Sequence, residues 1–404
     1  MGFFAHSLVL LALSPLAHAG FTTQSSVTIP PRNGPTNKLL FVNNGSRVIE
    51  VGNRELSRVY ALNDLSTYLL ITGQSFDSPA AIVERQTTRE IFYIGDIKED
   101  DWGGKVRRYL RGYSLNDNSV QTTYSSTLYK GASYNIPSFT FSLSPDENRI
   151  YLGKVGTNTI SVLNLDTYTS DATLTIPGID TRKIQMTHEL KYENSTVLAV
   201  DTKDTNGLST LHFYNPLLEK NILTLKAESF GLASGANYAT LRNTEFSKDD
   251  SQILMCGKTK CVVYNLSAKT VTASWAMDGS TVSSAKFSDD GRFVFVADGT
   301  YANPSFSVIA SATGQIVVPA FKIRSGGGVL LKVFATVDAQ TYVIMLKDRL
   351  LHLSGLDGSL LAEVVLPSST ESFESLAYLS EEPQSVRFLT SKSTGEISTW
   401  QLNL

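Results

Sequence analysis

The sequence is short of cysteine, of histidine and of any strong excess of charge, and each shortage excludes a class of protein. It has 2 cysteines, 3 tryptophans and 5 histidines in 404 residues, which excludes the small scaffolds that depend on many disulfides. Its 35 basic and 38 acidic residues give a net charge of −3, which excludes the broad basic surface of a dedicated nucleic-acid-binding protein. With 42% hydrophobic and 18% charged residues, the composition is that of a globular chain.

Long apolar runs are also missing. A membrane-spanning helix needs about 20 apolar residues, and no run after the first segment reaches that length. Residues 7–16 are uncharged and rich in leucine, valine and alanine, and Ala17-His18-Ala19 follows as a small-x-small cleavage pattern. We therefore expect a secretory signal peptide over residues 1–19, cut before Gly20, and a single secreted domain over residues 20–404. The alternative is a buried N-terminal helix.

Secretion gives meaning to two further features. Three asparagines, Asn44, Asn194 and Asn265, stand in acceptor sequons for N-linked glycans. Cys256 and Cys261 flank four residues that resemble a hairpin loop, so we expect a disulfide between them. The alternative is a two-thiol metal site, which lacks further cysteine or histidine ligands nearby in the sequence.

What the sequence does contain is a series of short strand-like runs. Apolar or alternating stretches of about 5 to 8 residues are separated by asparagine, aspartate, glycine and serine, which is typical of an all-β protein. One unit recurs as LSPDENRIY from residue 143, FSKDDSQIL from 246 and FSDDGRFVF from 287. Weaker copies begin at residues 190, 336 and 379, so the mean period is about 47 residues.

A four-stranded unit of this length, repeated around an axis, predicts a β-propeller. The paired runs give eight hairpins, so we favour eight blades; seven remain if Lys38 to Thr72 is irregular. The last blade appears three-stranded in the sequence. The run Phe21 to Ile29 is expected to supply its fourth strand, or else to begin the first blade.

One stretch carries a family resemblance. SPDENRIYLGKVGTNTISVLNL, residues 144–165, resembles a YVTN-type propeller repeat, and residues 287–314 are similar to that repeat and to WD repeats. The Gly-His and Trp-Asp pairs of true WD repeats are missing. The resemblance covers roughly residues 80–404 and implies the fold only. Such propellers include binding proteins, lactone-ring enzymes and quinoprotein dehydrogenases, so it does not select a function.

The innermost strands should line the central axis and carry the candidate site. The residue before each repeat start is expected at one level around the axis, and the polar members of that set are Glu189, Glu245, Lys286 and Tyr378. The carboxylates would be acid/base groups and the lysine an anion partner, and such a ring of oxygens would also suit calcium. The alternative is a polar wall with paired charges. No other cofactor is evident, and the histidines after residue 19 are scattered.

Three functional hypotheses follow. The first is a secreted, monomeric binding protein whose partner is an extracellular protein, a glycan or a small molecule, with no membrane span and no nucleic acid. The second is an extracellular enzyme of the propeller lactonase or cyclase type that acts on a small molecule at the axis. A quinoprotein dehydrogenase ranks third, because only 3 tryptophans are available as stacking platforms.

Overall fold

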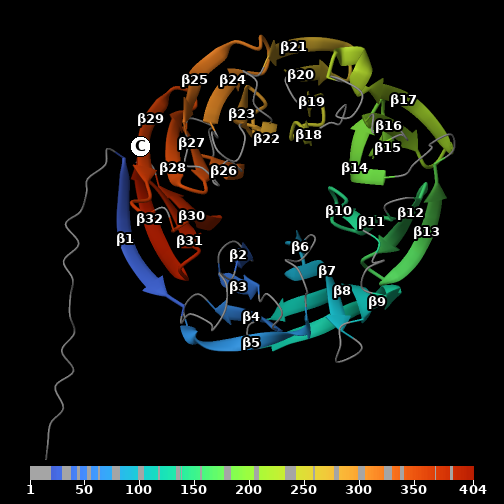
Figure 1. Ribbon diagram of the computed structural model, residues 1–404, viewed down its shortest axis with the longest axis horizontal. Coiled ribbons are helices and arrows are strands. Elements are labelled where there is room, and N and C mark those ends of the chain that lie inside the picture. Colours follow the sequence, from blue (N-terminus) through green and yellow to red (C-terminus); the bar gives the residue numbers. More distant parts are fainter. Residues whose placement is uncertain are drawn as a thin grey trace, which may run out of the picture.

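Eight β-sheets stand around a common axis in the computed structural model of the chain (Figure 1). Each sheet has four antiparallel strands, so the predicted propeller with eight blades is confirmed. Lys38 to Thr72 is not irregular, because it provides the first complete blade. The structure describes residues 20–29, 38–42, 46–51, 56–61, 64–74, 82–98, 104–116, 119–132, 137, 139–154, 157–176, 183–203, 209–232, 243–257, 260–276, 282–298, 305–322, 330–336, 341–368, 370–382 and 385–404.

The blades are numbered along the chain, each from its innermost strand outward. Blades 1 to 4 comprise β2 (Lys38–Val42), β3 (Arg47–Val51), β4 (Leu56–Ala61) and β5 (Asp64–Gln74); β6 (Ile82–Arg85), β7 (Glu90–Lys98), β8 (Lys105–Asn116) and β9 (Ser119–Ala132); β10 (Phe139–Leu143), β11 (Arg149–Lys154), β12 (Thr159–Asn164) and β13 (Thr169–Thr175); and β14 (Lys183–Tyr192), β15 (Ser195–Lys203), β16 (Ser209–Asn215) and β17 (Lys220–Lys226).

Blades 5 to 8 continue the ring. They comprise β18 (Asn243–Phe246), β19 (Gln252–Cys256), β20 (Lys260–Asn265) and β21 (Thr270–Ala276); β22 (Val282–Phe287), β23 (Phe293–Asp298), β24 (Ser305–Ala310) and β25 (Ile316–Lys322); β26 (Leu330–Ala335), β27 (Thr341–Leu346), β28 (Arg349–Ser354) and β29 (Leu360–Val365); and β30 (Phe373–Glu382), β31 (Ser385–Lys392) and β32 (Glu396–Asn403), with β1 (Phe21–Thr28) as the fourth strand of blade 8.

The ring is closed by the two ends of the described chain. Strand β1 pairs antiparallel with β32, from Phe21 opposite Leu402 to Thr28 opposite Glu396, which confirms that the N-terminal run completes the last blade. Phe21 is 2% exposed and packs against Phe388 and Trp400. The N-terminal strand is therefore anchored by its first apolar side chain.

The hydrophobic core lies in the seams between blades. Neighbouring residues of one strand pack against different blades. In β19 of blade 5, Ile253 packs against blade 4, whereas Leu254 packs against blade 6. Both are fully buried. Each sheet buries both of its faces, which explains why the second strands read as continuous apolar runs rather than alternating ones.

The repeated serine–aspartate unit forms the turn between the first and second strands. In blade 5, Ser247 Oγ accepts the amide of Gln252 at 2.9 Å and donates to Asp249 Oδ1 at 2.6 Å. Asp249 Oδ1 in turn accepts the amide of Ser251 at 3.1 Å. The serine–aspartate bond recurs in blades 3 and 6, between Ser144 and Asp146 and between Ser288 and Asp290. The sequence repeat is therefore a hydrogen-bonded turn lock.

Blade 5 holds the disulfide. Cys256 and Cys261 are directly opposite on β19 and β20, with Cα atoms 4.1 Å apart, and are joined as expected. Within the described residues, the single helix is the 3₁₀ turn η2 (Ala227–Phe230). Lys260 Nζ, beside the disulfide, donates to the carbonyl of Phe230 at 3.0 Å. In the described part of the chain, no helix has the length and apolar character needed to cross a bilayer.

Candidate functional site

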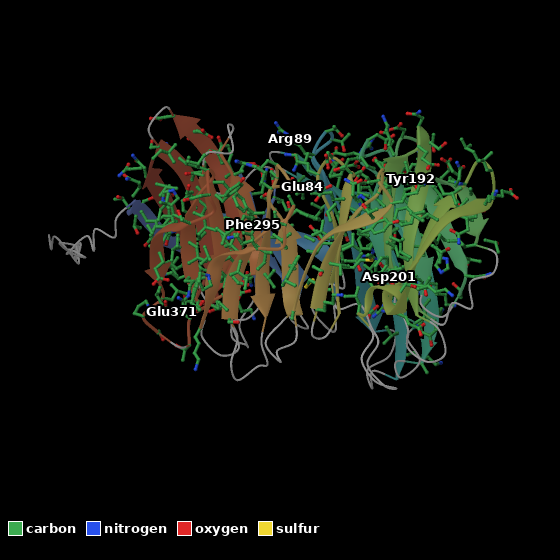
Figure 2. The ribbon with its side chains drawn as sticks, turned by 90° about the horizontal axis from the view of Figure 1, so that it is seen from above. Glu84, Arg89, Tyr192, Asp201, Phe295 and Glu371 are labelled. Carbon is green, nitrogen blue, oxygen red and sulfur yellow. A yellow bond between two sulfur atoms is a disulfide. The ribbon has the colours of Figure 1, made fainter. Side chains whose placement is uncertain are left out.

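The site lies at one end of the ring, called here the turn face. It is formed by the inner turns, which join the first and second strands of each blade, and by the outer turns, which join the third and fourth. Seen from the side, Arg89 and Tyr192 lie towards this end and Glu371 lies towards the other (Figure 2). Innermost strands of successive blades contact one another, for example β10 with β14 and β18 with β22.

A recurrent irregularity fixes how the blades correspond. In six blades the pairing of the third and fourth strands shifts near the outer turn, because the fourth strand carries an extra residue there. This bulge gives equivalent positions in blades whose turns differ in length. On the third strand of each of these blades, the bulge lies opposite the step between Gly112 and Tyr113, Val162 and Leu163, Phe213 and Tyr214, Val263 and Tyr264, Val308 and Ile309, and His352 and Leu353.

Counting inward from the bulge corrects the predicted level. Tyr214 faces Leu198, which faces Glu189, whereas in blade 5 the same steps from Tyr264 end at Phe246 and not at Glu245. Glu189 and Tyr378 are therefore one residue out of step with Glu245 and Lys286. The residues that share one level are Ser142, His188, Glu245, Lys286, Phe334 and Ala377.

Turn length explains the difference. In blade 4 the hairpin stays paired up to Tyr192 opposite Ser195, around a turn of only two residues. Blade 3 instead leaves the ladder at Leu143 and resumes it at Ile150. A slip of one residue turns every side chain to the other face of its sheet. Glu189 consequently faces blade 3, whereas Glu245 faces blade 6.

Glu189 acts between blades rather than at the axis. It is 9% exposed, and Tyr151 of blade 3 donates its hydroxyl to Glu189 Oε2. Arg149 Nη1 lies 3.9 Å from the other carboxylate oxygen. Burial, followed by the Glu189 hydrogen bond, raises the pKa of the Tyr151 hydroxyl, so that group remains a donor. Glu189 therefore links blades 3 and 4 through a hydrogen bond and an ion pair.

Glu245 and Lys286 do come together as predicted. Their Oε1 and Nζ atoms are 3.9 Å apart, and their side chains are 36% and 42% exposed. Burial raises the pKa of the Glu245 carboxyl, and the neighbouring charges of Lys286 and His188 oppose that shift. The pair therefore places a carboxyl with a raised pKa beside an ammonium group.

His188 is a third member of this level, in blade 4. Its ring stacks on Phe246 of the next blade, with centroids 4.5 Å apart and planes 10° from parallel. Its Nε2 atom is 3.2 Å from Asp250 Oδ1, and its side chain is one third exposed. The histidine thus joins blades 4 and 5 while presenting an edge to solvent.

Tyr378 belongs to a different, aromatic group. Its ring meets Phe334 of blade 7 edge-on, with centroids 5.7 Å apart, and Phe334 also contacts Phe388. Tyr378 remains 37% exposed. The innermost strands therefore change from charged side chains in blades 4 to 6 to aromatic ones in blades 7 and 8.

Other expected features have mixed outcomes. Among the described residues, no three His, Cys, Asp or Glu side chains are arranged to hold a metal ion. Asn194 and Asn265 lie in turns or at a strand end. Asn44 and residues 1–19 lie outside the described residues.

Three exposed leucines on the turn face were not anticipated from the sequence. Leu217 is 86% and Leu218 66% exposed in the outer turn of blade 4, and Leu356 is 85% exposed in that of blade 7. The signal was present, because the aligned outer turns of blades 3 and 5 have polar or small residues at these tips: Asp166, Thr167, Ser267 and Ala268.

Comparisons with known proteins support the fold alone. A solved structure described as the Dos1 propeller is similar over 94% of this chain and 95% of its own, with a TM-score of 0.62 and 8% sequence identity. No family model matches the chain, and no curated protein matches it. The YVTN and WD resemblance therefore stays at the level of a β-propeller, a fold commonly used for protein interaction.

Proposed function

We propose that this protein is a secreted binding propeller that holds a protein partner against its turn face. The observation that carries the proposal is the exposure of Leu217 and Leu218, at 86% and 66%. Large apolar side chains presented together at a surface mark interaction sites, and interface energy concentrates in a few such anchors.

The leucines are held in place rather than left mobile. Asn215 Oδ1 accepts the amides of Leu217 and Leu218 at 2.9 and 3.0 Å, and Glu219 closes the turn at φ 49°. Because the backbone is already ordered, binding through this tip costs little additional conformational entropy.

The fold does not require leucine at these positions. In blade 3, Asn164 Oδ1 accepts the amides of Asp166 and Thr167 at 2.9 and 3.2 Å, in the same turn with polar tips. Tyr168 supplies the closing residue there, at φ 55°. The apolar tips of blade 4 therefore serve something other than the turn.

The surrounding charge indicates the character of the partner. Exposed carboxylates on the turn face include Asp166 at 60%, Glu193 at 59% and Asp289 at 50% exposure of the side chain. Each of them is paired with a base, Arg85, Lys269 and Lys248 respectively, so the face carries both signs of charge, and a partner would be held mainly by an apolar pocket that receives the leucine tips. The buried disulfide of blade 5 is consistent with an oxidising compartment.

The test compares three forms of the secreted protein. Wild type, the double variant Leu217→Ser/Leu218→Ser, and Val365→Ser are immobilised and exposed to the medium of the producing cells, and captured proteins are quantified by mass spectrometry. Val365 is a matched control, since it is apolar and 42% exposed but lies at the far end of β29. A protein captured by wild type and the control but lost from the double variant supports the proposal. Identical capture by all three contradicts it.

A second candidate function rests on Glu245. A carboxyl whose pKa is raised by burial, beside an ammonium group, is suited to general acid catalysis. A panel of lactones assayed with wild type and Glu245→Gln tests this enzyme hypothesis. Turnover that is lost in the variant at unchanged melting temperature supports it, and no turnover of any lactone by wild type removes it.

A further inference from the structure

We infer that Asn194, at the inner turn of blade 4, carries an N-linked glycan, whereas Asn265 is left bare and serves the fold. The inference rests on the proposed secretion, since the modification belongs to the secretory pathway. Both asparagines stand in sequons, so the sequence predicts a glycan on each. Their surroundings in the structure are different.

Asn194 occupies the tip of the two-residue turn between β14 and β15. Glu193 and Asn194 have φ angles of 48° and 62°, and Tyr192 pairs with Ser195 across the turn. Two successive positive φ angles define the type I′ hairpin turn, in which asparagine is a favoured residue. Asn194 is exposed, and among the described residues its side chain has no hydrogen bond.

The neighbouring blade holds this turn from one side. Lys269 Nζ lies 2.7 Å from Glu193 Oε1 and 5.9 Å from the centroid of the Tyr192 ring. Tyr192 itself is 5% exposed. The contacts of the turn with blade 5 are thus made by the residues before Asn194, and the asparagine remains open to solvent.

Asn265 instead has a structural role, because it caps the outer turn of blade 5. Its Oδ1 accepts the amide of Ala268 at 2.7 Å, and its backbone pairs with Gln252 on one side and Thr270 on the other. Asn164 and Asn215 cap the outer turns of blades 3 and 4 in the same way, and neither stands in a sequon. The asparagine at this position is therefore explained by the turn that it caps.

The chemistry at Asn194 is a glycosyl transfer. The donor is an oligosaccharide linked to a lipid diphosphate. A bond forms between Asn194 Nδ2 and the anomeric carbon of the sugar, while the bond from that carbon to the diphosphate oxygen breaks. The lipid diphosphate leaves with the bonding electrons, and Nδ2 loses one proton. No oxidation or reduction is involved.

The glycan would lie beside the proposed binding site. The inner and outer turns of blade 4 are two strand spacings apart, about 10 Å. A glycan on Asn194 would therefore border Leu217 and Leu218 on the side nearer the axis, and would direct a partner to approach from the rim.

The experiment expresses the full chain in a eukaryotic secretory cell and measures intact mass and glycopeptides. Thr196→Ala removes the first sequon while keeping Asn194, and Asn194→Gly removes the acceptor at a position where positive φ favours glycine. Each is expected to lose the mass of one glycan. Ser267→Ala removes the second sequon and should change neither mass nor melting temperature.

A further pair of variants tests the structural role of Asn265. Asn265→Ala should lower the melting temperature, and Asn265→Asp, which keeps an oxygen acceptor, should restore most of it. Secreted protein with a bare Asn194, or with a glycan on Asn265, overturns the inference and leaves secretion standing. Chain retained in the cell with residues 1–19 intact and no glycan overturns the secretion proposal and the inference with it.

Discussion

Phe21 and His352 meet edge-on across the seam between blades 8 and 7, with ring centroids 6.0 Å apart. The contact ties the N-terminal strand to the preceding blade as well as to its own. Phe21 is the buried side chain of β1, whose other residues are exposed, and it anchors the start of the strand as the buried Ile29 anchors the chain just beyond its end.

Phe21→Ala should destabilise the protein by about 3 to 5 kcal/mol, the range for truncating a buried phenylalanine. The loss arises because the cavity opens at the pair of strands that closes the ring. The midpoint of urea unfolding measures it. Thr22→Ala, at an exposed position of the same strand, is the control and should move the midpoint little. Equal effects of the two variants would contradict the role of Phe21.

His352 should make stability fall in mild acid. Burial lowers its pKa from 6.5 to about 4, and its Nε2 atom lies 3.2 Å from Thr341 Oγ1. The unfolded chain binds a proton between these two values and the folded one does not, so stability falls as pH drops from about 6.5 towards 4. The contribution of this one group over that range is about 3 kcal/mol.

Urea midpoints measured from pH 7 to pH 4 test the histidine. His352→Gln, which cannot titrate, should show a shallower decline than wild type. A remaining slope is expected from His212, whose pKa burial also lowers to about 4. Parallel declines for wild type and variant would show that His352 does not contribute.

Ser247→Ala should open the inner turn of blade 5. The hydroxyl accepts the amide of Gln252 and donates to Asp249, and its hydrogen bond lowers the pKa of that aspartate. Leaving the amide without its partner costs about 1 to 3 kcal/mol. Hydrogen exchange at the Gln252 amide should accelerate in the variant. Unchanged exchange there would contradict the turn lock.

Glu189 and Glu245 should respond differently to truncation. Glu189→Ala leaves the buried Tyr151 hydroxyl without its acceptor and should cost about 1 to 3 kcal/mol. Glu245→Ala removes a half-exposed carboxyl whose charged form burial disfavours, so the melting temperature should change little. A lower melting temperature for Glu245→Ala than for Glu189→Ala would contradict the structural role assigned to Glu189.

The sequence by itself determined the features that depend on neighbouring residues. The serine–aspartate repeat predicts a turn because both side chains bond to backbone within five residues, and the disulfide follows from the four-residue hairpin loop that separates Cys256 from Cys261. The eight paired runs predicted eight blades, because a four-stranded sheet that must bury both faces does so by packing against neighbours around an axis. For the N-terminal run the sequence left two places open, the fourth strand of the last blade or the start of the first, and the pairing of β1 with β32 decided between them.

Only the tertiary structure decided which side chains meet between blades. The hairpin of blade 4 stays paired beyond the point where others turn, and this slip placed His188, not Glu189, level with Glu245. Tyr151 and Glu189 are 38 residues apart, and no local pattern links them. The exposure of Leu217 and Leu218 likewise depends on the outer turn of blade 4 and its unpacked tips. Side chains along a strand alternate between the two faces of the sheet. An alignment that is wrong by one residue therefore still predicts the correct fold, but it assigns each candidate side chain to the wrong face.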